Sequence, residues 1–423
     1  MDAPLLASTK PGEQLVELAE RHADEVAPGA AARDGAAAFP VEAFASLQAS
    51  GFLSACVPIE LGGLGVDSLH DVAVAFSRLG RGDAAVAIAA HMHVVAGWFV
   101  ARSWREAVAA GEAERDKAGA TDFLLRSIVS GDSIICSAAT EPGSDPPFHM
   151  TTATKVPGGW SISGRKSFGT ISPIATLFAT MLRLPGDDGG DAADGVDGWG
   201  AGVGYVPRGT PGLTVADNWD AMGMRASGSH DLLYEACVVP DVFVVRTGPW
   251  GRASPFWTRS MVAGNLGLLG AFLGIAEAAR AEALRLVGSR RKAPYDRPVA
   301  DKPGVRHGVG EMEMALYTAR AALERVGRRA DACFAQPDDE IDPEALDLLM
   351  REFQAAKWVV NRRAIDVVDT AMQVSGGAGY LSASPLSRHY RDVRAGPFMQ
   401  AWSPNEAFDE LARSVLGLPR DGG

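Results

Sequence analysis

The residues with the clearest chemical capacity lie near the C-terminus. Residues 373–380 read QVSGGAGY, and residues 387–394 read SRHYRDVR. Glycines accept positive φ angles and let backbone N–H groups approach a ligand closely, and amide and guanidinium groups suit the phosphates and hydroxyls of a nucleotide. This region therefore predicts a site for a dinucleotide.

The middle of the chain carries two segments with hydroxyl side chains. Residues 136–145, CSAATEPGSD, predict a strand that ends in a Pro-Gly turn, with the hydroxyls of Thr140 and Ser144 at one rim. A second segment, GRKSFGT, adds the apolar ring of Phe168 and the hydroxyl of Thr170. This combination can bind a flavin edge or a phosphate. The alternatives are an ordinary strand-ending turn and a core phenylalanine.

Two histidines, His91 and His93, lie in the apolar helical stretch 84–100. Residues two apart on a helix point in different directions, so they are not expected to bind one metal ion. No His-x-x-x-His pair or Cys/His cluster occurs, and no metal is predicted. One of these histidines is a candidate catalytic residue, and the alternative is a core histidine with satisfied hydrogen bonds.

In this order, the segments resemble the motifs of the acyl-CoA dehydrogenase flavoprotein family. The resemblance implies FAD as the cofactor, with FMN less favoured, held by the glycine run across a subunit boundary. It implies that the Thr170 hydroxyl hydrogen-bonds flavin N5 and that Phe168 replaces a tryptophan. The cofactor-binding positions of this sequence are then Thr140, Ser144, Phe168, Thr170, Arg291, Gln373, Gly376 and Gly377.

Two further segments resemble the family less closely. Arg291 lies in RRKAPYDRP, where a family arginine reaches the FAD pyrophosphate. Arg225 and Ser227 lie in GMRASGSHD, which corresponds to a family segment before a strand ending in Val-Pro. These two residues are candidate substrate contacts, and the alternative for Arg225 is that it braces a turn.

The family's catalytic glutamate has no counterpart. Its position, nine residues after Arg391, is occupied by Gln400, and the alternative position used by some members, directly before an arginine, holds Thr258. An amide is a very weak base, and losing general-base catalysis typically costs about 10²–10⁴-fold in rate. The same fold supports flavin monooxygenases, whose chemistry needs a dry pocket and a hydrogen-bond donor rather than a carboxylate base. The sequence therefore favours non-standard chemistry.

Composition limits the partners. A net charge of −12 offers no excess of Lys and Arg to neutralise nucleic acid or an anionic membrane. Four widely spaced cysteines and a start without a basic, apolar leader indicate a reducing, cytoplasmic location. The most apolar stretch, 261–279, has four glycines within roughly a 120° arc, which predicts close helix packing inside a soluble protein.

The spacing of apolar residues divides the 423 residues into three regions. Residues 1–130 predict a helical N-terminal domain, 131–245 a central β-barrel-like domain beside the flavin ring, and 246–423 a C-terminal four-helix bundle with FAD and oligomer contacts. The predicted fold class is α+β and acyl-CoA dehydrogenase-like. The central domain includes an acidic, glycine-rich stretch, 185–200, predicted to be a mobile hairpin loop.

Three hypotheses about function remain open. The first is a flavin oxidoreductase that performs a non-standard oxidation or monooxygenation of a specialised small molecule or carrier-bound intermediate rather than degrading fatty acids, with a flavin reductase or an electron acceptor as partner. The second is an acyl-thioester dehydrogenase with a different base, such as His91 or His93. The third is a silent FAD-binding scaffold. All three predict a homodimer or homotetramer.

Overall fold

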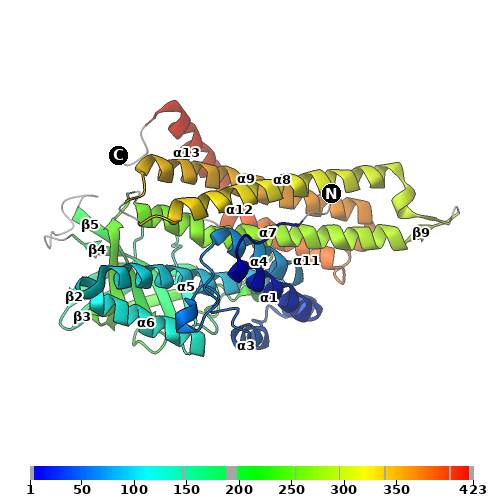
Figure 1. Cartoon of the computed structure of the whole chain (residues 1–423). Helices are drawn as coiled ribbons and strands as arrows, with labels where there is room; N and C mark the ends of the chain where they lie inside the picture. Colours follow the sequence, from blue (N-terminus) through cyan, green and yellow to red (C-terminus); the bar gives the residue numbers. More distant parts are fainter. Residues whose placement is uncertain are drawn as a thin grey trace.

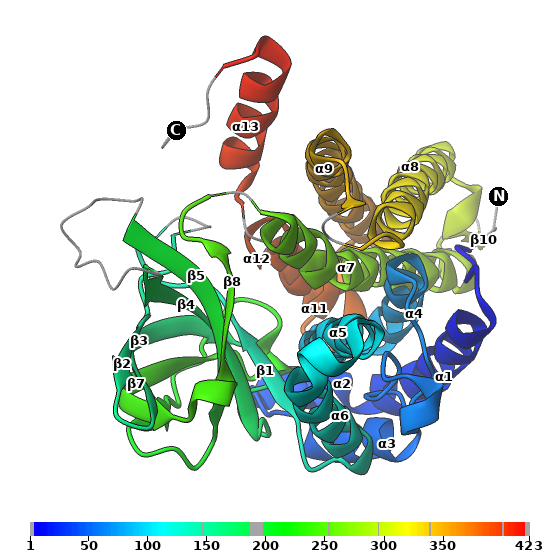
Figure 2. The ribbon, with the colours of Figure 1, turned by 60° about the vertical axis from the view of Figure 1, so that its left-hand side comes forward.

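The computed structural model describes residues 4–144, 148–186, 198–252, 254–294, 296–337, 340–399 and 402–418. Gln400 and most of the acidic stretch 185–200 lie outside these residues. The chain folds into an N-terminal helical region, a central mixed sheet and a C-terminal helical region, which confirms the predicted fold class. Figures 1 and 2 show the sheet at one end of a long helical body.

The N-terminal helices form a compact group beside the sheet (Figure 2). Asp83 caps the long helix that carries both candidate histidines, because its Oδ1 accepts from Ala85 N at 3.0 Å. The helices are α1 Lys10–Val26, α2 Ala30–Ala36, α3 Val41–Ala49, α4 Leu69–Gly82, α5 Ala84–Ala110 and α6 Arg115–Ser130.

The central sheet has the order β6-β7-β3-β2-β4-β5-β8, with β1 parallel to β4 off this path. Its register shifts between Lys166 and Gly169, opposite β7, which marks a bulge in β3. The strands are β1 Ile135–Ala138, β2 Thr152–Val156, β3 Gly159–Gly169, β4 Leu177–Pro185, β5 Trp199–Pro207, β6 Leu213–Val215, β7 His230–Val239 and β8 Val244–Pro249.

Three long helices, α7, α8 and α9, lie side by side and form the elongated part of the molecule (Figure 1). Asp342 caps α9 as its Asp-Pro-Glu start predicts, and Gly376 ends it with φ of 61°. The C-terminal elements are α7 Pro255–Ser289, β9 Arg291–Lys292, β10 Arg297–Pro298, α8 Pro303–Phe334, α9 Pro343–Ser375, α10 Gly377–Tyr380, α11 Pro385–Asp392, α12 Gly396–Met399 and α13 Pro404–Leu416.

The glycine face predicted within 261–279 packs α7 against α4. A Cβ at Gly270 would lie 2.1 Å from Ala73 O, and one at Gly274 would lie 2.3 Å from Ser77 O. Two helical stretches, Ala84–Ser130 and Pro255–Ser289, are long and apolar enough to cross a membrane, but 89% and 83% of their most apolar windows are buried inside the protein. Both are core helices.

Candidate functional site

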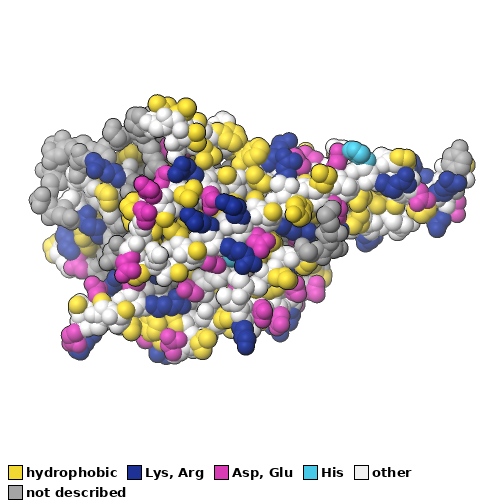
Figure 3. All heavy atoms as spheres, turned by 45° about the horizontal axis from the view of Figure 1, so that its top comes forward, with side chains coloured by type: hydrophobic (Ala, Val, Ile, Leu, Met, Phe, Trp, Pro, Cys, Tyr) yellow, Lys and Arg dark blue, Asp and Glu magenta, His cyan; other side chains and the backbone are white. Residues whose placement is uncertain are grey.

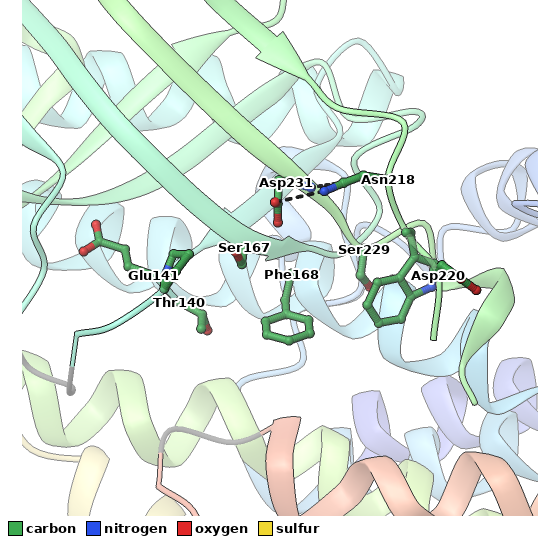
Figure 4. Close-up of a pocket in the computed structure, with 10 residues that line it drawn as sticks. Thr140, Glu141, Ser167, Phe168, Asn218, Asp220, Ser229 and Asp231 are labelled. Atoms are coloured by element: carbon green, nitrogen blue, oxygen red, sulfur yellow. Dashed lines mark hydrogen bonds between the residues drawn. The ribbon is translucent and has the colours of Figure 1, made fainter. Parts of the chain in front are cut away.

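A pocket of about 320 Å³ opens between the end of β1, the bulge of β3 and the segment that joins β6 to β7. Its volume is near the lower end of the range for small-molecule sites. In Figure 4, Thr140, Phe168 and Ser229 point from the sheet toward the helices. The lining residues are Thr140, Glu141, Pro142, Ser167, Phe168, Asn218, Trp219, Asp220, Ser229 and Asp231.

Phe168 forms an apolar wall of this pocket. It lies in the β3 bulge with φ of 57°, and 51% of its surface is exposed. Its ring meets that of Trp219 edge-on, with centroids 6.0 Å apart. The neighbouring Ser167 N donates to Thr140 O at 2.9 Å, so the predicted residues Thr140 and Phe168 are held at one rim.

A chain of three hydroxyls lies beside Phe168. Ser229 Oγ shares hydrogen bonds with Thr170 Oγ1 at 2.8 Å and with Ser227 Oγ at 2.7 Å. All three hydroxyl residues are buried, and of the three, within the described part of the chain, Ser229 is the one that belongs to the pocket lining. Thr170 Oγ1 also donates to Phe168 O at 3.4 Å, so three hydrogen bonds use the three hydroxyl protons and Ser229 Oγ keeps a lone pair as an acceptor at the pocket.

Two of the carboxylates that line the pocket, Glu141 and Asp231, form ion pairs with Lys166 and Arg165. Glu141 Oε1 accepts from Lys166 Nζ at 2.6 Å and from Thr151 N at 2.8 Å. Burial raises the pKa of Glu141, but the Lys166 charge and these hydrogen bonds outweigh it and lower the pKa to about 2. Asp231 pairs with Arg165 and accepts from Asn218 Nδ2 at 2.9 Å.

The third carboxylate, Asp220, is solvent-exposed. Its side chain is 93% exposed and lies 3.5 Å from Arg225 Nη1. Arg225 also donates Nε to Asp34 O at 2.9 Å and Nη1 to Ala221 O at 3.1 Å. Among the described residues, Arg225 is not in the pocket lining, and its contacts brace the turn. Substrate contact by Arg225 and Ser227 stays a prediction.

The two candidate histidines lie in the protein interior. His91 donates Nε2 to Gly264 O at 3.0 Å, and His93 Nδ1 accepts from Ile135 N at 2.9 Å. Both are 0% exposed, and burial lowers the pKa of each to about 4. In the described part of the chain, neither lines the pocket, so a catalytic role stays a prediction without geometric support.

The remaining cofactor positions that the structure describes are not part of the pocket lining. Ser144 donates to Glu141 Oε2 at 3.3 Å behind the rim. Gln373, Gly376 and Gly377 are exposed at the end of α9, and Arg291 is exposed in β9. Figure 1 shows β9 at the tip of the helical body opposite the sheet, and Arg290, directly before β9, donates Nη1 to Ser375 O at 2.9 Å, so the end of α9 lies near β9. One subunit therefore does not bring the two groups of cofactor positions together.

The second position for a base is also occupied by a neutral residue. Thr258 is 6% exposed, and the adjacent Arg259 lies 5.9 Å from the ring of Phe334. Among the described residues, no group of three His, Cys, Asp or Glu side chains is arranged to hold a metal ion.

The pocket suits an isoalloxazine ring. It combines an exposed aromatic plate, Phe168, with the hydroxyl of Ser229 and the strand-end rim of Thr140, and ring systems of this kind need an apolar face and a few placed polar groups. The sequence missed Ser229, although the Ser-Gly-Ser run at 227–229 was a signal, because nothing local shows which hydroxyl faces a cavity.

Fold and site define a flavin-dependent oxidoreductase of the acyl-CoA dehydrogenase type. Family models described as "Acyl-CoA dehydrogenase, N-terminal domain", "middle domain" and "C-terminal domain" match residues 11–109, 136–237 and 266–403, and the chain belongs to this family. FAD is therefore the expected cofactor, and FMN is the alternative.

The chain is also similar to individual proteins whose names are more specific than that of the family. The chain is 36% identical to the L-evernosamine nitrososynthase of a Micromonospora strain, over 99% of this chain and 93% of the relative. It is also 36% identical to the amino sugar nitrososynthase DnmZ of Streptomyces peucetius, over 97% and 94%. The structure of KijD3 in complex with FMN and dTDP-3-amino-2,3,6-trideoxy-4-keto-3-methyl-D-glucose superposes with a TM-score of 0.86 at 33% identity, over 99% and 96%.

Proposed function

We propose that the protein is a flavin-dependent monooxygenase that oxidises the amino group of a nucleotide-linked amino sugar. In the first turnover, O2, two electrons and two protons convert R-NH2 to R-NHOH and water. In the second, the same inputs convert R-NHOH to R-N=O and two waters. Flavin, reduced by a separate reductase, supplies the electrons and activates O2.

The observation that carries this proposal is the state of the pocket carboxylates. Removing a proton from carbon needs a carboxylate that an apolar environment makes basic. Glu141 is paired with Lys166, Asp231 with Arg165, and Asp220 is solvated. An amine carries its own lone pair, so oxygen transfer to nitrogen does not require such a base. This favours oxygenation over thioester dehydrogenation.

The chain's own residues supply the remaining requirements. Phe168 and Trp219 present apolar surface that excludes water from one side of the pocket. Ser229, oriented by Thr170 and Ser227, presents a hydroxyl oxygen that can accept a hydrogen bond from the flavin ring or from the substrate. We propose these residues as the active-site wall.

The relatives support the substrate class, since two are named as amino sugar nitrososynthases and one structure contains a dTDP-linked amino sugar. A homo-oligomer completes the cofactor site in this proposal, because Arg291 and the Gly376-Gly377 run are exposed and lie apart from Phe168. Hydrophobic side chains on the surface of the C-terminal helices (Figure 3) offer an interface; exposed ones include Phe398, Phe408, Val415 and Leu416. We propose a cytoplasmic location, as expected from composition.

The test is a reconstituted assay with flavin, a flavin reductase, NADH and a panel of dTDP-linked sugars that differ only in an amino or hydroxyl group. We expect the amino sugars alone to gain oxygen, first as the hydroxylamine and then as the nitroso product, detected by mass spectrometry. Turnover of the hydroxyl sugars at the same rate would contradict the proposal.

The same protein preparation distinguishes the other two hypotheses. Anaerobic mixing of the oxidised holoprotein with short-chain acyl-CoA would bleach the flavin if the protein were a thioester dehydrogenase. Failure of both the amino sugars and the thioesters to change the flavin would indicate a binding scaffold. We expect no bleaching by thioesters.

A further inference from the structure

Helix α11 contacts the segment that joins β6 to β7 through hydrogen bonds and close backbone packing. Arg391 donates Nη1 to Met222 O at 3.1 Å, and Asp392 Oδ1 accepts from Met224 N at 2.6 Å. The backbones also touch here, since a Cβ at Gly223 would lie 2.5 Å from Arg391 O. Three consecutive residues of the segment are thus fixed by two consecutive residues of α11.

The N-terminal helices contribute to the same contact. Arg391 Nη1 also donates to Asp34 Oδ1 at 3.0 Å, and Arg225 Nε donates to the backbone O of Asp34 at 2.9 Å. Asp34 lies in α2, Arg391 in α11 and Arg225 just before β7. All three parts of the fold therefore meet at one cluster of hydrogen bonds.

Asp392 acts here as a hydrogen-bond acceptor. It is 2% exposed, and its nearest cation is Arg388, whose Nη1 lies 3.9 Å away and also 3.8 Å from Asp83. Burial raises the pKa of Asp392 to about 7, against the Arg388 charge and the Met224 N–H and with the charges of Asp83 and Asp34. The protonated and ionised forms both accept from Met224 N, so an amide is a fair substitute.

Met224 connects the contact with α11 to the pocket. This residue has φ of 54°, in the left-handed region that non-glycine residues adopt only when their surroundings hold them. Its backbone O accepts from Trp219 Nε1 at 3.2 Å, and Trp219 meets Phe168 edge-on in the pocket. A continuous set of contacts thus joins α11 to the pocket wall.

We infer that Arg391 and Asp392 are positioning residues for the flavin pocket, acting through Met224 to hold Trp219 against Phe168. This assignment rests on the proposed function in that the pocket is taken to hold flavin. It gives the Arg-Asp pair of α11 a role that does not depend on a glutamate further along the chain.

The test is a double-mutant cycle on flavin affinity, with FMN and FAD as separate probes titrated into apoprotein by flavin fluorescence. We expect Asp392→Ala to weaken binding about tenfold or more, because it removes the acceptor of a buried N–H. In a Trp219→Ala background the same change should cost less than about threefold, since the residue it positions is gone. Asp392→Asn should restore most of the affinity.

Two controls separate positioning from general damage. Asp369→Asn removes the partner of Arg394 in the turn after α11 and should leave flavin affinity unchanged. Hydrogen exchange of the apoprotein should be faster over residues 217–225 in Asp392→Ala than in the wild type, and this readout stands even if neither flavin binds. Equal losses of affinity in the wild-type and Trp219→Ala backgrounds, or unchanged exchange, would overturn the inference.

Discussion

The buried pair of Lys166 and Glu141 makes a strong quantitative prediction. Lys166 is 0% exposed, and its Nζ lies 2.6 Å from Glu141 Oε1. Burial lowers the pKa of Lys166 to about 8 against the opposing charge of Glu141, so the ammonium stays charged at neutral pH. Lys166→Met would leave Glu141 buried without its cation.

Two lines of reasoning give the size of the effect. Breaking a buried ion pair from one side typically costs about 3–5 kcal/mol. The pKa of Glu141, lowered from 4.5 to about 2, corresponds to about 3 kcal/mol of interaction favouring the carboxylate. We therefore expect Lys166→Met to lower the free energy of unfolding by about 3–5 kcal/mol.

The assay is urea denaturation followed by tryptophan fluorescence, for Lys166→Met, Glu141→Gln and the double variant. The double variant should be less destabilised than the sum of the single changes, because removing both partners leaves no unpaired charge. The matched control is Lys155→Met, since Lys155 pairs with Asp241 at the surface and should contribute less than about 1 kcal/mol. A loss below about 1 kcal/mol for Lys166→Met, or additive single changes, would refute the reasoning.

Three further predictions concern the pocket and the core. Ser229→Ala should leave the fold intact but release more hydrogen peroxide per NADH consumed, measured by a peroxidase assay; Ser229→Thr should restore part of the coupling. Phe168→Ala should weaken FMN binding about tenfold, because it removes an aromatic contact of about 1 kcal/mol or more, and an unchanged dissociation constant would remove Phe168 from the site. The pKa of His91 and His93 is lowered by burial to about 4, so the stability they contribute is present above pH 6.5 and is lost as the pH falls through 4. At pH 5 each buried histidine should lower the free energy of unfolding by about 2 kcal/mol relative to neutral pH. His93→Asn keeps an acceptor for Ile135 N, so a shift from pH 7.5 to 5 should lower its free energy of unfolding less than that of the wild type.

The sequence predicted the elements whose signals are local. The apolar periodicity of α8 and α9 and the Asp-Pro-Glu start of α9 all correspond to observed helices. The glycines of α7 predicted close packing because only a residue without a Cβ allows the observed approach to Ala73 O and Ser77 O. Phe168 was expected as an apolar plate beside the flavin; it is exposed in the β3 bulge, and its contact with flavin stays a prediction.

The contacts behind the pocket could not be predicted. Asp34, Arg225 and Arg391 are far apart in the sequence, and no periodicity or spacing predicts that Arg225 binds the backbone O of Asp34 while Arg391 binds its carboxylate. The pairing of Lys166 with Glu141 depends on the segment after β1 lying beside β3, where Ser167 N donates to Thr140 O, and no local pattern predicts that contact. For His91 and His93 the residue type suggested a catalytic role, whereas the structure buries both side chains in the packed interior.

The central claim is that this site transfers oxygen to nitrogen and does not abstract a proton from carbon. Its most direct test is turnover of a dTDP-linked amino sugar under isotopically labelled O2, with the product analysed by mass spectrometry. We predict that the label appears on the amino nitrogen and that product forms only when both reduced flavin and O2 are present. Unlabelled product, or flavin reduction by an acyl thioester without O2, would contradict it.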